Sequence, residues 1–425
     1  MRIGIDIRPT QFQNGLRGIG RYTYDLVKGL ARYAPGNEYV LLASPDRPLP
    51  EGWQNLPDCC RVAPLPTRFM GEYSWRQSIR RVWRLRYLRH QRDHAAGLRQ
   101  VVERERLDLV HLPSVIEPFF FAGGDVGCPV VKTLYDLVPL IFVADCLETW
   151  PEAQRYVYRR QLDSFHQADV VLAISASARQ DAITHIGLTP EKVQVVSCAV
   201  PPQFTPMDDQ ARMDACLAAY NIRSPYFLFC SGGGSNKNRE RIVRAFGAFR
   251  QRFDQPWPLV FVGPDDGDDV RNLKSIAWDI GLDRRDLLIT GYVPDEDLVT
   301  LFAGAQGLVS PTLYEGFGLP AAQAMQAGVP VVAANTSSYP EVVGDAGILV
   351  DPYDVDAIAE ALLRLARDPD LRAELGRRGQ ARAARFRLEN QADALIQVYE
   401  QLMTRSKPAT RPQAPLLVEA FRALR

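Results

Sequence analysis

The sequence has little that would place it in a membrane, in an oxidising compartment or on nucleic acid. None of its apolar runs is long enough to span a bilayer, which argues against an integral membrane protein. Its 50 basic and 50 acidic residues balance, which argues against a globally basic nucleic-acid binder. Its seven cysteines form no Cys-x-x-Cys pair and no zinc-type cluster with the five histidines. We therefore expect a cytoplasmic protein in a reducing compartment that starts directly with a strand and has no metal site.

The length and the hydrophobic pattern predict two α/β domains. A chain of 425 residues is long for a single core. Short apolar runs alternate with helical patterns, as in a doubly wound parallel sheet. Strands are expected at 2–7, 38–43, 107–112, 129–135, 170–174, 193–197, 226–230, 258–262, 287–290 and 305–309. The predicted parts are a first domain at 1–203, a hinge at 204–224, a second domain at 225–386 and a tail at 405–425.

The stretch Ser310–Pro320 is the most informative part of the sequence. It follows an apolar run and contains Gly316 and Gly318, and Pro320 suits the first turn of a helix because its missing N–H costs nothing there. At the carboxyl end of a strand in an open α/β sheet, such a turn offers free N–H groups and a partial positive charge to an anion such as a diphosphate. Glu315 would then accept hydrogen bonds from nearby hydroxyl groups. The alternative is an ordinary strand-to-helix turn in which Glu315 only caps the helix.

Two more glycine-rich turns follow strands. Gly18 and Gly20 precede a helix and can bring backbone amides close to phosphate or sugar, although such turns abound in α/β proteins. The run Gly232–Gly234 precedes Lys237, and no Gly-Lys-Ser/Thr follows, so this is not a P-loop. Taken alone, Lys237 is better explained as a solvated loop lysine.

The span Trp75–Arg92 combines seven arginines with tryptophans and aliphatic residues. A basic amphipathic helix with tryptophan suits an anionic membrane surface, such as the inner face of the inner membrane. The alternative is a packed helix whose arginines cover its solvated side. The pattern leaves both interpretations open.

Several short motifs together resemble one family. The first is Glu315-Gly316-Phe317-Gly318-Leu319-Pro320, and the others lie at 328–332, 340–344, 350–352, 18–22, 168–175, 237–238 and 291–294. Their order and spacing resemble the retaining glycosyltransferases of family 4 (group 1), in particular bacterial mannosyl- and rhamnosyltransferases. The resemblance implies the GT-B fold, in which two Rossmann-like doubly wound parallel-sheet domains face each other across a cleft. It also implies that 387–404 forms a last helix that crosses back to the first domain.

The resemblance implies a role for each motif residue. Lys237 contacts the donor diphosphate, Glu315 contacts the donor sugar and Asp136 lies near the reacting centre, so these three are the candidate catalytic residues. The residues implied in donor binding are Gly18, Gly20, Asn236, Tyr292, Val293, Phe317, Gly318, Leu319 and Gln323. Lys237 and the helix N-terminus would do the electrostatic work that other transferases assign to a metal, so we expect activity without a metal or cofactor.

Three positions depart from the family pattern. Gln323 stands where relatives have a second glutamate, and its neutral amide is a weaker acceptor for ribose hydroxyls. Tyr135 replaces a family histidine. Asn236 stands near the place of an arginine, for which Arg239 or Arg241 could compensate. These departures keep two alternatives open: a non-catalytic or weakly active partner protein with this fold, and a nucleotide-sugar epimerase.

The expected function is hexose transfer, with retention of anomeric configuration. The donor would be a nucleotide sugar, with GDP-mannose considered first, and the acceptor a glycan or a lipid-linked saccharide in cell-surface polysaccharide synthesis. Because the first domain of this family faces the acceptor, a membrane contact through Trp75–Arg92 would suit a lipid-linked acceptor.

Overall fold

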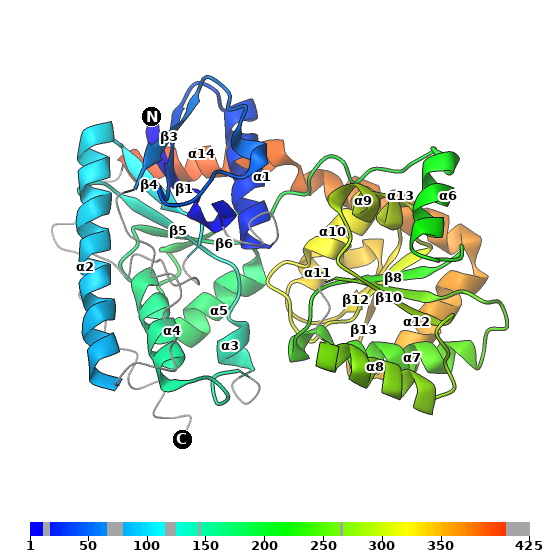
Figure 1. Cartoon of the computed structure of the whole chain (residues 1–425). Helices are drawn as coiled ribbons and strands as arrows, with labels where there is room; N and C mark the ends of the chain where they lie inside the picture. The colour runs from blue at the N-terminus through cyan, green and yellow to red at the C-terminus, as the bar shows by residue number, and fades with distance from the viewer. Residues whose placement is uncertain (12–17, 66–79, 115–124, 143–145, 264–266, 405–425) are drawn as a thin grey trace. The chain divides into compact units, whose positions relative to one another are not determined.

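The structure, a computed structural model, describes residues 1–11, 18–65, 80–114, 125–142, 146–263 and 267–404 (Figure 1). The chain divides into two units, each built on one parallel sheet. The first comprises Met1–Ala199 and the chain from Leu388, and the second comprises Val200–Arg387. The two doubly wound α/β domains expected from the sequence are therefore confirmed.

The described part of the first unit contains a seven-stranded sheet with the strand order β3-β2-β1-β4-β5-β6-β7. Its strands are β1 (Arg2–Asp6), β2 (Glu38–Ala43), β3 (Cys60–Pro64), β4 (Leu109–Leu112), β5 (Val130–Leu134), β6 (Val170–Ala173) and β7 (Val193–Val195), all parallel. Its helices are α1 (Ile19–Tyr33), α2 (Arg80–Glu105), α3 (Val138–Ile141), α4 (Glu152–Phe165), α5 (Ala176–Ile186) and α14 (Leu388–Thr404), with short 3-10 turns η1 (Arg8–Gln11) and η2 (Glu51–Trp53). The central strands β4, β5 and β6 are wholly buried, as expected for a parallel sheet covered on both faces.

Six parallel strands form the sheet in the described residues of the second unit, in the order β10-β9-β8-β11-β12-β13. They are β8 (Phe227–Cys230), β9 (Leu259–Val262), β10 (Leu287–Gly291), β11 (Gly307–Ser310), β12 (Val331–Ala334) and β13 (Ile348–Val350). The helices are α6 (Gln210–Ala219), α7 (Arg239–Arg250), α8 (Gly267–Asp279), α9 (Asp295–Gly304), α10 (Leu319–Gln326), α11 (Tyr339–Val342), α12 (Val355–Arg367) and α13 (Pro369–Ala383), with 3-10 turns η3 (Ser235–Lys237), η4 (Gly344–Ala346) and η5 (Ala384–Phe386). Helices α7, α8 and α12 cover one face, and α9, α10 and α13 lie on the other (Figure 1). The strand order reverses between β8 and β11, which is where ligands bind in such sheets.

The range 204–224, expected as a hinge, instead belongs to the second unit. It contains helix α6, which packs against α9, and the Tyr220 hydroxyl donates to Asp297 Oδ2 at 2.7 Å. The unit already begins at Val200, whose N–H donates to Phe386 O at 2.7 Å. The proline-rich composition therefore marks a packed entry segment rather than a free linker.

Helix α14 lies in the range expected for the last helix and packs against α1 in the first unit. A buried polar network joins it to the sheet. His111 on β4 lies 2.7 Å from the Tyr399 hydroxyl on α14 through Nδ1 and 2.8 Å from Thr133 Oγ1 on β5 through Nε2. All three side chains are fully buried. Because each polar atom has a partner, the network fixes the position of α14 without a desolvation penalty for an unpaired group.

We expect the His111 network to make the first unit sensitive to acid. Burial lowers the pKa of His111 from 6.5 to about 3, so the unfolded chain binds a proton at pH 5 that the folded protein does not. The free energy of unfolding should therefore fall as the pH drops below 6.5, and this residue should account for a loss of about 2 kcal/mol between pH 7.5 and pH 5. Urea unfolding at both pH values checks this.

Other groups also titrate in that range, so the comparison is between the wild type and His111→Gln. The variant should be less stable at pH 7.5 and should lose less stability on acidification. Exposed His185, replaced by Gln, is the matched control and should behave as the wild type. An equal pH-dependent loss in His111→Gln and the wild type would contradict the prediction.

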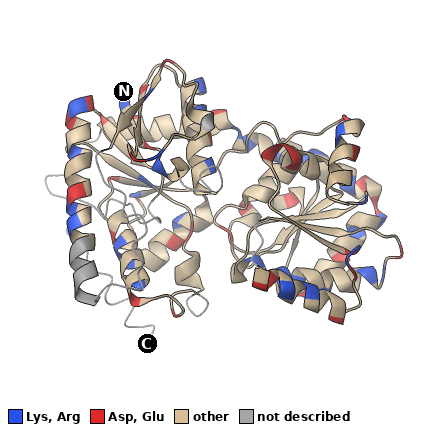
Figure 2. Cartoon of the chain, in the orientation of Figure 1, with Lys and Arg blue, Asp and Glu red and all other residues tan. Residues whose placement is uncertain are grey.

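Acidic and basic residues are interspersed along the helices of both units (Figure 2). Of the segment Trp75–Arg92, residues 75–79 lie outside the described residues, and the rest forms the start of α2. Tyr87 is buried and meets the Tyr156 ring edge-on at 6.0 Å, whereas Leu88 is exposed. Within the described residues, no helix is both long and apolar enough to cross a bilayer. Membrane contact through this segment stays a prediction.

Candidate active site

The loop that follows β11 is shaped by a close contact between a glycine and a tyrosine. Gly318 precedes α10 with φ +86°, in the left-handed region that glycine adopts readily. A Cβ atom at this position would lie 2.6 Å from Cε1 of Tyr339. The glycine therefore serves both the turn and the packing, and it brings the N-terminus of α10 to the carboxyl edge of the sheet.

Tyr339 packs against this loop and is fully buried. Its hydroxyl lies 2.7 Å from Ser310 Oγ and accepts from Thr312 Oγ1 at 3.3 Å. Burial raises the pKa of Tyr339, so the hydroxyl keeps its proton. The sequence analysis missed this residue, although the family-like motif at 340–344 begins directly after it.

Two serines next to Tyr339 bind the backbone of Glu315. The Glu315 N–H donates to Ser337 Oγ at 3.1 Å, and Ser338 Oγ donates to Glu315 O at 3.0 Å. The backbone of Glu315 is thus held on both sides, which leaves its side chain free to act at the sheet edge.

Lys237 and Glu315 come together at the point where the strand order reverses. Lys237 lies in η3, which follows β8, and Glu315 lies in the loop after the neighbouring β11. Lys237 Nζ is 2.7 Å from Glu315 Oε1, and the two side chains are 20% and 16% exposed. Glu315 therefore pairs with Lys237 instead of capping α10, and Lys237 is not a freely solvated loop lysine.

Asn236, expected to bind the donor, has a positioning role in the structure. Its side chain is buried and its Nδ2 donates to Tyr314 O at 3.1 Å, while its backbone O accepts from Leu313 N at 2.8 Å. These bonds join η3 to the Glu315 loop. The two arginines considered as replacement cations lie on α7: Arg239 pairs with Asp269, and Arg241 donates to Asn238 Oδ1.

The remaining expected donor residues of the second unit differ in exposure. Tyr292 follows β10 at the same sheet edge and is 56% exposed, as a side chain that stacks on a base would be, whereas Val293 is buried. Phe317 is also buried, with its ring edge-on to Phe386 at 5.2 Å, so it supports the loop from inside. Gln323 is half-buried in the second turn of α10, and Leu319 is half-buried at its start.

The expected residues of the first unit lie at two helix starts. Gly18 is the N-cap of α1 with φ +49°, and Gly20 is buried in its first turn. Asp136 follows β5, and its Oδ1 accepts from the N–H of Val138, the first residue of α3, at 3.1 Å. Tyr135, in the place of the family histidine, is buried with its ring edge-on to Tyr22 at 5.1 Å. The Tyr135 ring is therefore a packing group.

In the part of the chain that the structure describes, no three or more His, Cys, Asp and Glu side chains are grouped as metal ligands would be. The cation that the geometry does place at the sheet edge is the ammonium of Lys237.

Comparisons with known proteins decide the family. The model described as Glycosyltransferase Family 4 matches residues 16–204, and the model described as Glycosyl transferases group 1 matches residues 219–382. The chain is 32% identical over 277 residues to the O-antigen chain mannosyltransferase B of Escherichia coli, which covers 64% of this chain and 70% of that protein. The chain belongs to the family 4 glycosyltransferases.

Two further similarities extend over nearly the whole chain of this glycosyltransferase. The serotype-specific mannosyltransferase WbdA of Escherichia coli is 26% identical over 439 residues, which cover 97% of this chain and 50% of WbdA. The chain thus spans about half the length of that relative. The sucrose-phosphate synthase tll1590 of Thermosynechococcus elongatus has a similar structure, with a TM-score of 0.72 at 21% identity over 95% of this chain and 100% of that one. This likeness confirms the GT-B fold class.

Proposed function

We propose that this glycosyltransferase moves a hexose from a nucleotide sugar to a glycan or lipid-linked acceptor in cell-surface polysaccharide synthesis. The transfer retains the anomeric configuration, and mannose is the first candidate for the hexose. The names of the relatives support mannose and O-antigen-type glycans. The observation that carries the proposal is the pair of Lys237 and Glu315 beside the N-terminus of α10.

The chemistry follows from what each group offers. In sugar transfer from a nucleoside diphosphate, negative charge grows on the leaving phosphate oxygen. Lys237, the N–H groups of Gly318 and Leu319, and the partial charge of the α10 N-terminus would stabilise it. Glu315 would accept hydrogen bonds from sugar hydroxyls and fix the anomeric carbon. The leaving phosphate oxygen would take the proton of the acceptor hydroxyl, so no separate base is required.

A screen of nucleotide sugars by thermal shift and by release of nucleoside diphosphate tests this function. Each donor is assayed with and without a saccharide acceptor. The proposal requires one donor to raise the unfolding temperature and to be consumed faster when the acceptor is present. An epimerase would convert the donor into a second nucleotide sugar without any acceptor, and a non-catalytic partner protein would consume none.

We expect turnover to be independent of divalent metal. The reason is that Lys237 would supply, at the donor diphosphate, the positive charge that a metal ion supplies in metal-dependent transferases. Treatment with EDTA should leave the initial rate nearly unchanged. A loss of most activity that magnesium or manganese restores would contradict the expectation.

Gln323 should set a modest preference for the ribose of the donor. A neutral amide is a weaker acceptor for a hydroxyl pair than a carboxylate. The variant Gln323→Glu should therefore increase the affinity for ribonucleotide donors more than the affinity for deoxyribonucleotide donors. The measurement is the affinity of the wild type and the variant for matched ribo and deoxyribo donors. If neither affinity nor selectivity changes, Gln323 does not face the ribose. If the variant gains activity that the wild type lacks, the partner-protein alternative is correct.

A further inference from the structure

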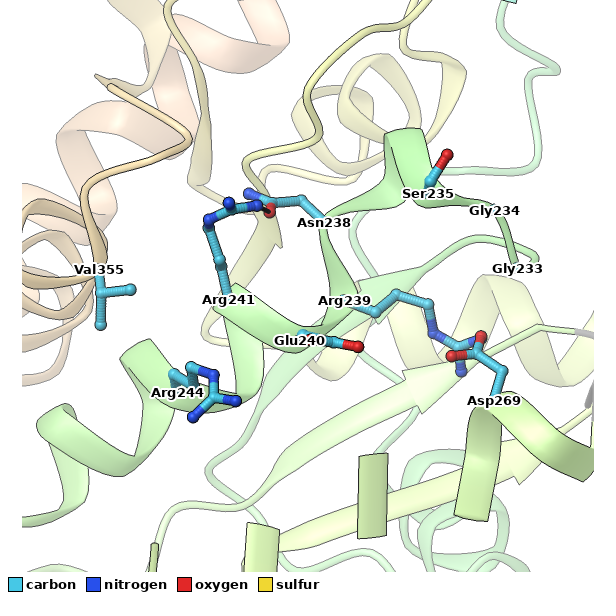
Figure 3. Close-up of a pocket in the computed structure, with 10 residues that line it drawn as sticks. All are labelled: Gly233, Gly234, Ser235, Asn238, Arg239, Glu240, Arg241, Arg244, Asp269 and Val355. Carbon is cyan, nitrogen blue, oxygen red and sulfur yellow. Dashed lines mark hydrogen bonds and ion pairs between the residues drawn. The ribbon is translucent and has the colours of Figure 1, made fainter. Parts of the chain in front are cut away.

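A pocket lies beside the turn that follows β8 in the second unit (Figure 3). It is open to solvent and has a volume of about 780 Å³, which is in the range of small-molecule sites. Its walls come from the turn after β8 and from α7, α8 and α12, and the lining residues are Gly233, Gly234, Ser235, Asn238, Arg239, Glu240, Arg241, Arg244, Asp269 and Val355. Neither Lys237 nor Glu315 lines it, although Ser235 and Asn238 lie on either side of Lys237 in the chain, so the pocket adjoins the candidate active site.

Three arginines from the first turns of α7 line this pocket, and their partners differ. Arg239 is buried and forms a salt bridge with Asp269, so its charge is balanced. Arg241 and Arg244 lie on the side of the pocket toward Val355 (Figure 3). Among the described residues, no carboxylate forms a salt bridge with either of them. This wall of the pocket therefore carries two positive charges that no described carboxylate neutralises.

Arg241 is already held in place. Its Nη1 donates to Asn238 Oδ1 at 3.0 Å, and its guanidinium lies over the Tyr353 ring at 5.0 Å. Asn238 is buried, and its Nδ2 donates to Pro311 O at 2.8 Å and to Pro352 O at 2.7 Å. Both contacts of Arg241 are neutral, so they orient the guanidinium without cancelling its charge. An arginine fixed in this way loses little side-chain entropy when it binds a ligand.

Two more features of the pocket wall suit an anion. Gly233 and Gly234 present backbone without side chains, and Gly234 has φ +130°, a conformation available to glycine. Arg239 is 6% exposed, and its Nε is a buried donor without a hydrogen-bond partner among the described residues. Of the two acidic side chains at the pocket, Asp269 pairs with Arg239, whereas Glu240 keeps its charge because its Oε1 accepts from the neutral Asn272 Nδ2 at 2.7 Å. Three arginines against two carboxylates leave the described lining net positive.

We propose that this pocket binds a phosphate-bearing ligand, a phosphate monoester or a diphosphate, through Arg241 and Arg244. Guanidinium groups match phosphate oxygens with two parallel hydrogen bonds and keep their charge at every physiological pH. The ligand is either a soluble phosphorylated compound or a lipid whose headgroup ends in a phosphate monoester, and both present the same group to the arginines. The site does not depend on the proposed sugar transfer.

Equilibrium dialysis with radiolabelled inorganic pyrophosphate tests the site. The protein carries Lys237→Ala in every sample, so that the active site has lost its cation and contributes little. The test variant adds Arg241→Gln and Arg244→Gln. The matched control adds Arg377→Gln and Arg378→Gln on α13, which removes the same net charge away from the pocket, where both arginines pair with Glu374. Thermal unfolding verifies that all proteins are folded.

The proposal predicts that the Lys237→Ala protein binds one pyrophosphate per chain, that the test variant weakens binding about tenfold or more, and that the control does not. The double variant Arg241→Lys with Arg244→Lys keeps both charges but loses the paired N–H donors of the guanidinium groups. It should bind pyrophosphate with an intermediate affinity. Loss of pyrophosphate binding in Lys237→Ala itself, or equal affinity in the test and control variants, would overturn the proposal.

Sedimentation with liposomes of phosphatidylcholine and phosphatidic acid, whose headgroup is a phosphate monoester, distinguishes the two sources of phosphate. Binding to these vesicles that the test variant loses and the control keeps identifies a lipid headgroup. Pyrophosphate binding without any such loss identifies a soluble ligand.

Discussion

Replacement of Lys237 by Ala should lower sugar transfer by about 10- to 150-fold. A charge-assisted hydrogen bond to a phosphate oxygen is worth about 1.5 to 3 kcal/mol, and a loss of this size in the transition state gives that factor. Lys237 Nζ is placed for the contact because Glu315 Oε1 holds it at 2.7 Å at the carboxyl edge of β8 and β11. The variant should bind the free nucleoside diphosphate more weakly to a similar extent.

Glu315→Gln should have the larger effect and abolish measurable transfer while the protein stays folded. Glutamine keeps the shape of the side chain but cannot balance the charge of Lys237, and it accepts more weakly from sugar hydroxyls.

Steady-state kinetics and calorimetric titration with the nucleoside diphosphate measure both variants. Lys274→Ala removes an exposed lysine of α8 in the same unit and serves as the control. Unchanged affinity for the nucleoside diphosphate in Lys237→Ala would remove Lys237 from the active site.

Gly318→Ala should lower transfer by about 100-fold. The new Cβ would lie 2.6 Å from Cε1 of Tyr339, and Tyr339 cannot retreat easily because it is fully buried and bound to Ser310 and Thr312. The loop must therefore shift, and a displacement of about 1 Å in groups that position a substrate costs a factor of that order.

The control for Gly318→Ala separates backbone strain from the collision. Gly281 has nearly the same conformation, φ +81°, but a Cβ there would meet nothing within 4 Å. Gly281→Ala should lower the free energy of unfolding by about 1 to 2 kcal/mol, the strain of an alanine in the left-handed conformation, and should keep its activity. If Gly318→Ala keeps full activity, or if both variants lose activity equally, the contact with Tyr339 does not position the donor loop.

Much of the fold could be predicted because the strands of a parallel sheet are buried on both faces and therefore appear in the sequence as continuous apolar runs. The runs at 170–174 and 226–230, for example, contain β6 and β8. Strand β3, Cys60–Pro64, was missed because it lies at the sheet edge, where alternate residues are partly exposed and the apolar signal is weak. Helix α6 was assigned to a hinge because prolines and polar residues precede it, and only its packing on α9 shows that it belongs to the second unit.

The residues that carry the chemistry of the candidate site could be predicted from the sequence, but the residues that hold them in position could not. Lys237 and Glu315 stand in motifs that follow strands, so both were expected at the same sheet edge, but their ion pair was not predicted. The positioning roles of Tyr339 and Asn236 depend on contacts between segments far apart in the sequence, which no local pattern records. The ring of Phe317 packs on Phe386, a contact that its place in the motif does not indicate, and its role in donor binding stays a prediction.

The most direct test of the proposed function is to follow GDP-mannose and a mannose-containing acceptor by NMR in the presence of the enzyme. The expected result is an acceptor-dependent loss of GDP-mannose and the appearance of a new mannosyl linkage with the anomeric configuration of the donor, both absent with Glu315→Gln. An inverted linkage, or conversion of donor into another nucleotide sugar without acceptor, would contradict retaining sugar transfer. If GDP-mannose is not consumed, the same experiment is repeated with the donor that the thermal-shift screen selects, and no transfer from any of them would contradict the proposed activity.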